Sequence, residues 1–107
     1  MGSNADCIFC KIVAGDIPCA KLLETESALA FLDIGPVADG HLLLIPKTHA
    51  ETVDQLSAEE ASAVLRSLPA LVGAVKRALG CSAVNVLQNN GRLAGQLVPH
   101  VHFHVIP

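Results

Sequence analysis

The segment Pro99-His100-Val101-His102-Phe103-His104-Val105-Ile106 determines how the rest of the sequence is interpreted, because three histidines alternate in it with apolar residues. Successive side chains on a strand point to opposite faces. As a strand, the segment places its three histidines on one face and Val101, Phe103 and Val105 on the other. The apolar face can be anchored in a core, and the histidine face then becomes a row of imidazoles about 6.5–7 Å apart.

The composition is that of one compact domain that can bury a core. Of 107 residues, 51% are hydrophobic and 16% are charged, which excludes a disordered chain. A net charge of −3, three Phe and no Trp or Tyr argue against a nucleic-acid polymer as partner, because both a basic patch and a stacking platform are missing. No apolar run approaches the roughly 20 residues of a membrane span, and the N-terminus does not resemble a signal peptide. We therefore expect no membrane partner and a cytoplasmic location, with the nucleus also open.

Caps and turns divide the remaining residues into a short helix, four strands and one long helix. The pattern predicts a helix over 7–15, capped by Asp6 and ended by Gly15, and strands over 21–24, 28–33, 41–46 and 82–88. The run over 41–46 is apolar throughout, which is typical of a strand buried on both faces. Residues 89–95 form a turn that returns the chain, antiparallel, into the histidine strand.

The long helix begins at a capping box made by Ser57 and Glu60 and ends at Gly80. Pro69 lies inside it and should kink or loosen it. Its predicted apolar stripe consists of Ala61, Val64, Leu65, Leu68, Val72, Val75 and Leu79. The whole order, α-β-β-β-α-β-β, predicts a single α+β domain over residues 1–107, with a largely antiparallel five-stranded sheet, a short N-terminal helix and one long helix.

The histidine strand allows three interpretations. The imidazoles can be ordinary hydrogen-bonded groups. This interpretation is the least favoured, because three histidines alternate in one strand. Two or three can bind a catalytic metal, since His-x-His on a strand presents two nitrogens to one ion. One can be a nucleophile whose neighbours tune it or bind an anion.

Two further motifs bear on that choice. Cys7-x-x-Cys10 has the spacing of a zinc half-site, and two buried thiols or a redox pair are the alternatives. Without a secretion signal, reduced thiols or a metal site are expected rather than disulfides. The turn over 89–96 can bind a phosphate through backbone amides and an Asn carboxamide, or it can be a plain hairpin turn.

Together these motifs resemble the histidine triad (HIT) family, closest to its Hint-like branch in the Cys-x-x-Cys variant. Residues 100–106 match the family's His-φ-His-φ-His-φ-φ motif. The other matches are the segments 7–12, 31–34 and 40–49, and Asn89, Gly91, Gly95 and Gln96. The resemblance covers essentially the whole chain and implies a HIT-like fold.

The resemblance implies a nucleotide hydrolase or nucleotidyl transferase, similar to an adenosine 5′-monophosphoramidase. Its substrates would be phosphoramidates or related nucleotidyl conjugates of a purine nucleotide. His102 would form a covalent nucleotidyl-histidine, with His104 beside the α-phosphate and His41 in the same cleft. Asp33 would bind the ribose hydroxyls, and the base pocket would be apolar. The implied nucleotide-binding residues are Phe9, Ile12, Phe31, Asp33, Ile34, Asn89, Gly95, Gln96, Leu97, Val98 and His104.

Rival hypotheses come from other classes. One is a zinc-containing, nucleotide-binding regulatory or scaffold protein with little activity. Another is a dinucleoside polyphosphate hydrolase. A third places a catalytic zinc between His102 and His104.

The resemblance also implies a structural Zn²⁺ held by Cys7, Cys10, His49 and His100, and a homodimer. Two departures from the family stand out. Leu97 occupies a position where many Hint-branch members have a serine that can help the phosphate or the leaving amine. The sequence also stops at Pro107, where family members usually continue, so the C-terminal tail of the family is expected to be absent.

Overall fold

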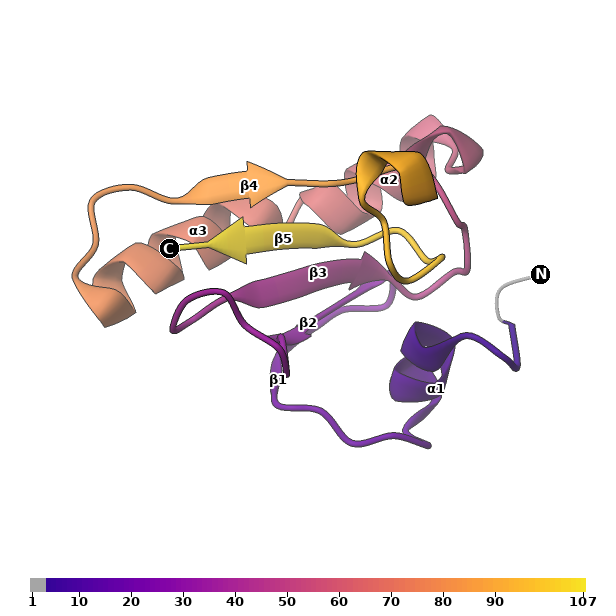
Figure 1. Cartoon of the computed structure of the whole chain (residues 1–107), viewed down its shortest axis with the longest axis horizontal. Helices are drawn as coiled ribbons and strands as arrows, with labels where there is room; N and C mark the ends of the chain where they lie inside the picture. The colour runs from indigo at the N-terminus through magenta and orange to yellow at the C-terminus, as the bar shows by residue number, and fades with distance from the viewer. Residues whose placement is uncertain (1–3) are drawn as a thin grey trace.

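The computed structural model describes residues 4–107 and contains a five-stranded antiparallel sheet with helices on both faces (Figure 1). The strands lie in the order β1-β2-β3-β5-β4. Helices α2 and α3 lie behind the sheet in Figure 1, and α1 lies beside its other face. The elements are α1 (Ile8–Ala14), β1 (Lys21–Glu24), β2 (Ala28–Leu32), β3 (Leu42–Pro46), η1 (Val53–Gln55), α2 (Ala58–Leu65), α3 (Leu68–Leu79), β4 (Asn85–Leu87), η2 (Arg92–Ala94) and β5 (Phe103–Ile106).

Strand β3 is buried along its whole length, as the apolar run predicted. Leu42 and Leu44 belong to the core that the sheet forms with α2 and α3. Leu43 and Ile45 belong to a second core, against α1. Because neighbouring residues of one strand enter opposite cores, β3 joins the two layers of the domain.

The predicted long helix is present over residues 58–79, and it is loosened where Pro69 was expected to disturb it. The capping box of Ser57 and Glu60 opens α2. Arg66 and Ser67 keep right-handed helical dihedral angles between α2 and α3. Pro69 lies in the first turn of α3, where a missing N–H leaves no helical hydrogen bond unmade.

The buried stripe of this helix differs from the predicted one at two positions. Leu71, which the prediction left out, is buried beside Val75. Leu79 is 45% exposed, although its side chain lies over Gly40, where an added Cβ would come within 2.5 Å of it. Gly40 also has a φ of +83°, so both space and backbone favour glycine at that turn.

The short helix and the strand predicted over 82–88 differ in the structure from their predicted limits or caps. The helix α1 is capped by Cys7 rather than by Asp6, because the Cys7 sulfur accepts the Cys10 amide hydrogen at 3.4 Å. Gly15 ends it in the left-handed conformation, as predicted. The strand predicted over 82–88 is regular only over Asn85–Leu87 and is exposed, because it is an edge strand.

The histidine strand is regular only over Phe103–Ile106. Its ladder pairing with β3 stops at the Leu44–Phe103 pair although β3 continues to Pro46, which has no amide hydrogen to donate. The Val101 amide instead donates to the Ala50 carbonyl at 2.8 Å. Within β5 the predicted division of faces holds: Phe103 and Val105 pack toward the helices, and His104 lines a cleft on the other face.

Within residues 4–107, no helix combines the length and the apolar character that crossing a membrane requires.

Candidate functional site

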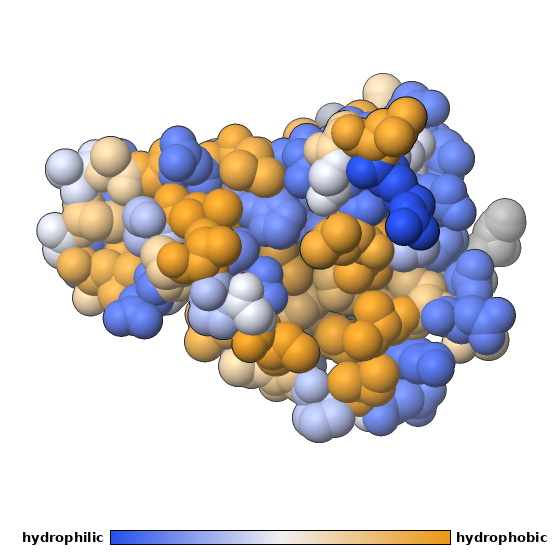
Figure 2. Space-filling view, viewed as in Figure 1, coloured by the Kyte–Doolittle hydropathy of each residue, from blue (hydrophilic) through white to orange (hydrophobic). Residues whose placement is uncertain are grey.

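A cleft of about 440 Å³ crosses the sheet on the face that packs against α1. The strand register places Phe31 opposite Leu43, Leu43 opposite His104, and His104 opposite Leu87. All four side chains line the cleft, which therefore runs from α1 to the edge strand β4 with histidines between. Figure 2 shows apolar surface gathered over α1 and around the hollow beside it.

His102 lies in the wall of this cleft and is only 6% exposed. Its Nδ1 lies 2.7 Å from the His100 carbonyl oxygen. Because a carbonyl can only accept, Nδ1 of the neutral ring carries the hydrogen and Nε2 carries the lone pair. The edge of Phe9 packs against the ring, with centroids 5.2 Å apart and planes at 84°. The ring is thus fixed in one orientation and one tautomer.

His41 and His104 form a relay that starts from a backbone amide. The Val37 N–H donates to His41 Nδ1 at 3.2 Å, so His41 carries its hydrogen on Nε2. That Nε2 lies 2.9 Å from His104 Nδ1 and 3.4 Å from an Asp33 carboxylate oxygen. His104 therefore accepts on Nδ1 and presents Nε2–H as a donor.

The neutral form of His104 is favoured by its surroundings. Burial lowers the pKa of the imidazole below its ordinary value, and the neighbouring His102 and His41 add to this shift, while Asp33 opposes it. At neutral pH the ring can thus accept from His41 and donate to a ligand at the same time.

The α1 half of the cleft is apolar and contains the predicted base-pocket residues. Phe9 and Phe31 meet edge to face, with centroids 5.7 Å apart. The predicted residues that line the cleft are Phe9, Ile12, Phe31, Asp33, Ile34, His41, Asn89, Gly95, Leu97, Val98, His102 and His104. The structure brings them together from α1, β2, β5 and the three loops that follow β2, β4 and η2.

Nine further residues line the cleft and were not predicted: Ile8, Ile17, Pro18, Cys19, Gly35, Val37, Leu43, Leu87 and Ile106. Leu43 could have been found from its place in the buried apolar run, once that run was paired with the histidine strand. No sequence pattern marks Ile17, Pro18 and Cys19 as cleft residues, because the position of their loop depends on how α1 packs.

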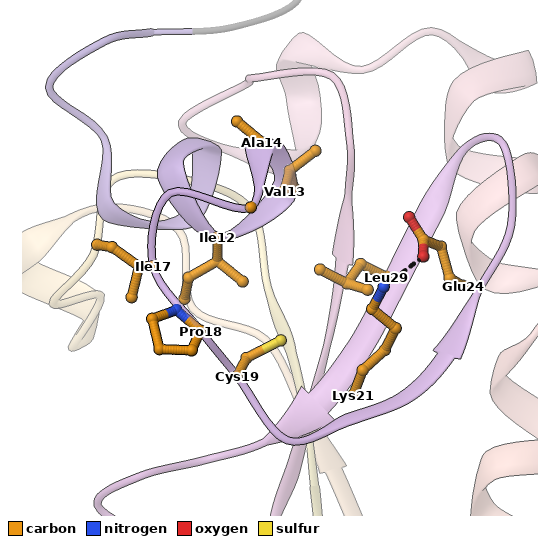
Figure 3. Close-up of a pocket in the computed structure, with 10 residues that line it drawn as sticks. Ile12, Val13, Ala14, Ile17, Pro18, Cys19, Lys21, Glu24 and Leu29 are labelled. Carbon is orange, nitrogen blue, oxygen red and sulfur yellow. Dashed lines mark hydrogen bonds and ion pairs between the residues drawn. The ribbon is translucent and has the colours of Figure 1, made fainter.

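A smaller pocket of about 230 Å³ adjoins the α1 half of the cleft (Figure 3). It shares Ile12, Ile17, Pro18 and Cys19 with the cleft. An ion pair between Lys21 and Glu24, 2.6 Å long, lies at its edge. The loop after α1 thus forms a thin wall between the two cavities.

The loop before β5 carries the predicted phosphate-binding residues. The Asn89 side chain donates to the Gly95 carbonyl at 3.4 Å. Gly95 has a φ of +96°, and a Cβ there would lie 3.5 Å from the Asn89 amide nitrogen. Glycine at 95 thus provides the backbone conformation that lets the loop turn against Asn89.

Gln96 differs from the other predicted nucleotide-binding residues, because it does not line the cleft. It is 4% exposed, and its carboxamide is fully occupied by backbone groups. The oxygen accepts from the Gly91 amide at 2.7 Å, and the nitrogen donates to the Glu51 and Val98 carbonyls at 2.6 and 2.9 Å. Gln96 therefore ties the loop to the segment after His49.

Cys7, Cys10, His49 and His100 form a cluster whose ligand atoms all lie within 4.8 Å of one another. The two Nδ1 atoms are 3.2 Å apart, and three sulfur-to-nitrogen distances are 3.3, 3.4 and 3.6 Å. A tetrahedron with zinc-like bonds of ~2.05 Å to nitrogen and ~2.3 Å to sulfur has edges of about 3.3 Å and about 3.6 Å. The donor atoms therefore have the spacing of a tetrahedral metal site.

The protonation of these groups also fits a metal. His100 Nε2 lies 2.8 Å from the Pro46 carbonyl, which directs the unprotonated Nδ1 into the cluster. Burial lowers the pKa of His100 to about 4, so the ring stays neutral. Backbone amides of Asn4 and Cys10 donate to the two sulfurs at 3.4 Å. Burial raises the pKa of the Cys10 thiol, and a bound cation would reverse that shift.

A second cluster, Asp33, His41 and His104, has comparable spacing but different protonation. The Val37 amide occupies Nδ1 of His41, so the nitrogen that faces the cluster carries a hydrogen. A protonated nitrogen cannot ligate a metal. This cluster therefore fits a proton relay, and His102 belongs to neither cluster.

Comparison with known proteins identifies the family. The sequence profile of the HIT domain matches residues 14–107. The chain belongs to the HIT family. It is 57% identical over 101 residues to adenosine 5′-monophosphoramidase hnt1 of Schizosaccharomyces pombe, covering 94% of this chain and 73% of that protein. It is 41% identical over 102 residues to adenylylsulfatase HINT3 of Arabidopsis thaliana, covering 95% of this chain and 52% of that protein.

The fold of this HIT chain agrees with that of a solved relative. The crystal structure of a HIT family member from Bacillus subtilis is 49% identical and superposes with a TM-score of 0.93, covering 95% of this chain and 72% of that one. The predicted HIT-like fold and Hint-like branch are therefore confirmed.

The role of Gln96 in this HIT chain can be tested by separating its acceptor from its donors. Gln96→Leu removes all three hydrogen bonds, and Gln96→Glu keeps only the acceptor for Gly91. We expect each variant to lose about 1–3 kcal/mol of unfolding free energy, because buried backbone groups lose their partners. We also expect faster amide hydrogen exchange across residues 91–98, measured by NMR. Glu59→Leu, at an exposed position in α2, is the matched control and should change neither. Unchanged amide exchange in both Gln96 variants would show that the hydrogen bonds of the Gln96 side chain do not hold the loop.

Proposed function

We propose that this chain is a nucleotide hydrolase that cleaves nucleoside 5′-phosphoramidates through a covalent nucleotidyl group on His102. The observation that carries the proposal is the His102 ring, which lies in the cleft wall with its hydrogen tied to the His100 carbonyl and its lone pair on Nε2. The class of enzyme, a HIT-type nucleotide hydrolase, is also the class named by its relatives.

The proposed reaction has two displacements. In the first, Nε2 of His102 attacks the α-phosphorus, the P–N bond to the amine breaks, and the amine leaves with a proton taken from solvent water. In the second, water attacks the phosphorus, the bond to Nε2 breaks, and a proton returns to solvent. The net reaction consumes one water and gives a nucleoside monophosphate and an amine. Division of one displacement into two lowers the barrier of each.

Neighbouring groups would stabilise the charges that develop. The ring of His102 becomes cationic on attack, and the His100 carbonyl already accepts from its Nδ1. The Nε2–H of His104 and the Asn89 carboxamide can donate to the phosphoryl oxygens. Asp33 is a pure acceptor suited to ribose hydroxyls, and a purine base fits the apolar α1 half of the cleft.

Replacement of the nucleophile should abolish turnover and spare binding. With adenosine 5′-phosphoramidate as substrate, we expect His102→Ala to lower kcat by at least about 10³-fold. AMP binding, measured by calorimetry, should change little, because the base pocket and Asn89 remain. Mass spectrometry after an alkaline quench should detect the nucleotidyl adduct on the wild-type chain and not on the variant. Full turnover by His102→Ala would refute the proposed nucleophile.

We also propose that the cluster of Cys7, Cys10, His49 and His100 holds a structural Zn²⁺. Thiolate and imidazole ligands suit zinc, and four protein ligands leave no position open for a substrate. When bound, the ion supplies a crosslink between α1 and the segment that leads into β5.

Metal analysis tests this assignment directly. We expect one zinc per wild-type chain and little in Cys10→Ser. The matched control Cys81→Ser, whose thiol lies outside the cluster, should retain it. Removal of zinc should lower Tm by on the order of 10 °C, since each kcal/mol shifts Tm by about 4–8 °C in a domain of this size. A chain that binds no metal and melts unchanged in chelator would rule out the structural ion.

We further propose a homodimer that forms through β4. This edge strand carries no charge over Asn85–Leu87, and Val86 is 44% exposed. The other edge, β1, carries the ion-paired Lys21 and Glu24, which guard an edge against pairing. Light scattering should give twice the monomer mass, and Val86→Lys should give a monomer, whereas Leu93→Lys at a fully exposed position should not. A monomeric wild type would exclude this proposal.

A further inference from the structure

The half of the cleft between the histidines and the edge strand is apolar. Leu87 lies opposite His104 in the sheet, and Ile106 follows His104 on the same face. Leu97 also lines the cleft, from the loop before β5, and this loop meets the residues after β4 where Asn89 donates to the Gly95 carbonyl. Leu97 is 91% exposed. We call Leu87, Asn89, Leu97 and Ile106 the β4-side subsite. Asn89 is its only polar member.

The two halves of the cleft suit different parts of a substrate. The α1 half contains the edge-to-face pair of Phe9 and Phe31 and adjoins the smaller pocket. A nucleobase gains most from aromatic contacts of this kind. The β4-side subsite contains no aromatic ring. With the nucleoside in the α1 half and its phosphorus at His102, the group on the other side of phosphorus faces the β4-side subsite.

Charge excludes one large class of leaving groups. Among the residues that the structure describes, none that lines the cleft is a lysine or arginine, and Asp33 is the one carboxylate. Arg92 lies in the neighbouring helix η2 but not in the cleft wall. A sulfate or a chain of phosphates would therefore lose hydration without gaining a cationic partner, which is costly for an anion.

We propose that the β4-side subsite binds the leaving group, that it selects an uncharged apolar amine, and that Leu97 is its specificity-determining residue. This inference rests on the proposed function, because it assigns the leaving group of the same reaction. The exposed Leu97 side chain is covered when an apolar amine is bound, and this removal of apolar surface from water favours binding. A polar or anionic amine gains no such contact.

Three adenosine 5′-phosphoramidates with a two-carbon linker test the proposal. Their amines are phenethylamine, 2-methoxyethylamine and 2-aminoethanesulfonate, which are apolar, neutral polar and anionic. We expect kcat/KM to be at least about tenfold higher for the phenethyl compound than for the anionic one. Adenosine 5′-phosphosulfate and diadenosine tetraphosphate should be poorer still. Equal rates, or a preference for an anionic leaving group, would overturn the assignment.

Variants at position 97 link the preference to the residue. Leu97→Ser should reduce the advantage of the phenethyl compound to within about threefold, because the apolar contact is lost. Leu97→Lys should raise kcat/KM for the sulfonate compound, because it supplies a cation. Arg92→Ala is the matched control, and it should leave the order of the three substrates unchanged. A reversed order in Arg92→Ala would show that Arg92, and not Leu97, sets specificity.

Binding to His102→Ala separates this inference from the proposed hydrolysis. Calorimetry with the same three compounds measures leaving-group preference without turnover. If wild type hydrolyses none of them but the affinities keep the predicted order, the hydrolysis is wrong and the subsite assignment holds. If wild type hydrolyses all three equally and the affinities are equal, the hydrolysis holds and the subsite assignment is wrong.

Discussion

The hydrogen bonds of His100 are the constraint on which the rest of the site depends. Its ring donates from Nε2 to the Pro46 carbonyl, which turns Nδ1 toward Cys7, Cys10 and His49. Its own carbonyl accepts from Nδ1 of His102, which leaves the lone pair of that ring on Nε2. One fully buried residue therefore sets both the donor atom of the proposed zinc site and the tautomer of the proposed nucleophile. Displacement of His100 would disturb both sites at once.

The sheet makes that arrangement possible because β3 is buried on both faces. One face of β3 packs on α2 and α3, and the other faces α1 and the cleft. The strand that carries the histidines is anchored because Val105 and Phe103 pack into the core formed with α2 and α3. Phe9 completes the enclosure, since its ring contacts His100, His102 and Phe31. It lies between Cys7 and Cys10 in the sequence, so the placement of α1 also shapes the cleft.

Sequence patterns predicted the strands, the capping box and the long helix, because alternation and capping are local properties of the chain. The residues that meet in each cluster were expected only from the family resemblance. The patterns failed where position depends on distant partners. The regular part of the histidine strand begins at Phe103, because the Val101 amide donates to the Ala50 carbonyl rather than to β3, a contact that residues 99–106 alone do not reveal. Gln96 was predicted to contact the nucleotide and instead binds backbone groups, since its partner Glu51 is brought near only by the fold. Leu71 was missed because the predicted stripe passed from Leu68 to Val72, whereas in α3 Leu71 and Val75 are the buried residues.

Backbone groups, rather than side-chain charges, fix the proton positions of three histidines. The Pro46 carbonyl sets His100, the His100 carbonyl sets His102, and the Val37 amide sets His41 and through it His104. A carbonyl or an amide cannot change its role with pH, whereas a carboxylate partner can be protonated. This explains how two clusters with similar spacing acquire opposite properties. The Pro46 carbonyl accepts from Nε2 of His100, so the Nδ1 that faces the two cysteines keeps its lone pair. The Val37 amide donates to Nδ1 of His41, so the Nε2 that faces His104 carries a hydrogen. The chemistry of each cluster therefore follows from which backbone group lies behind the ring.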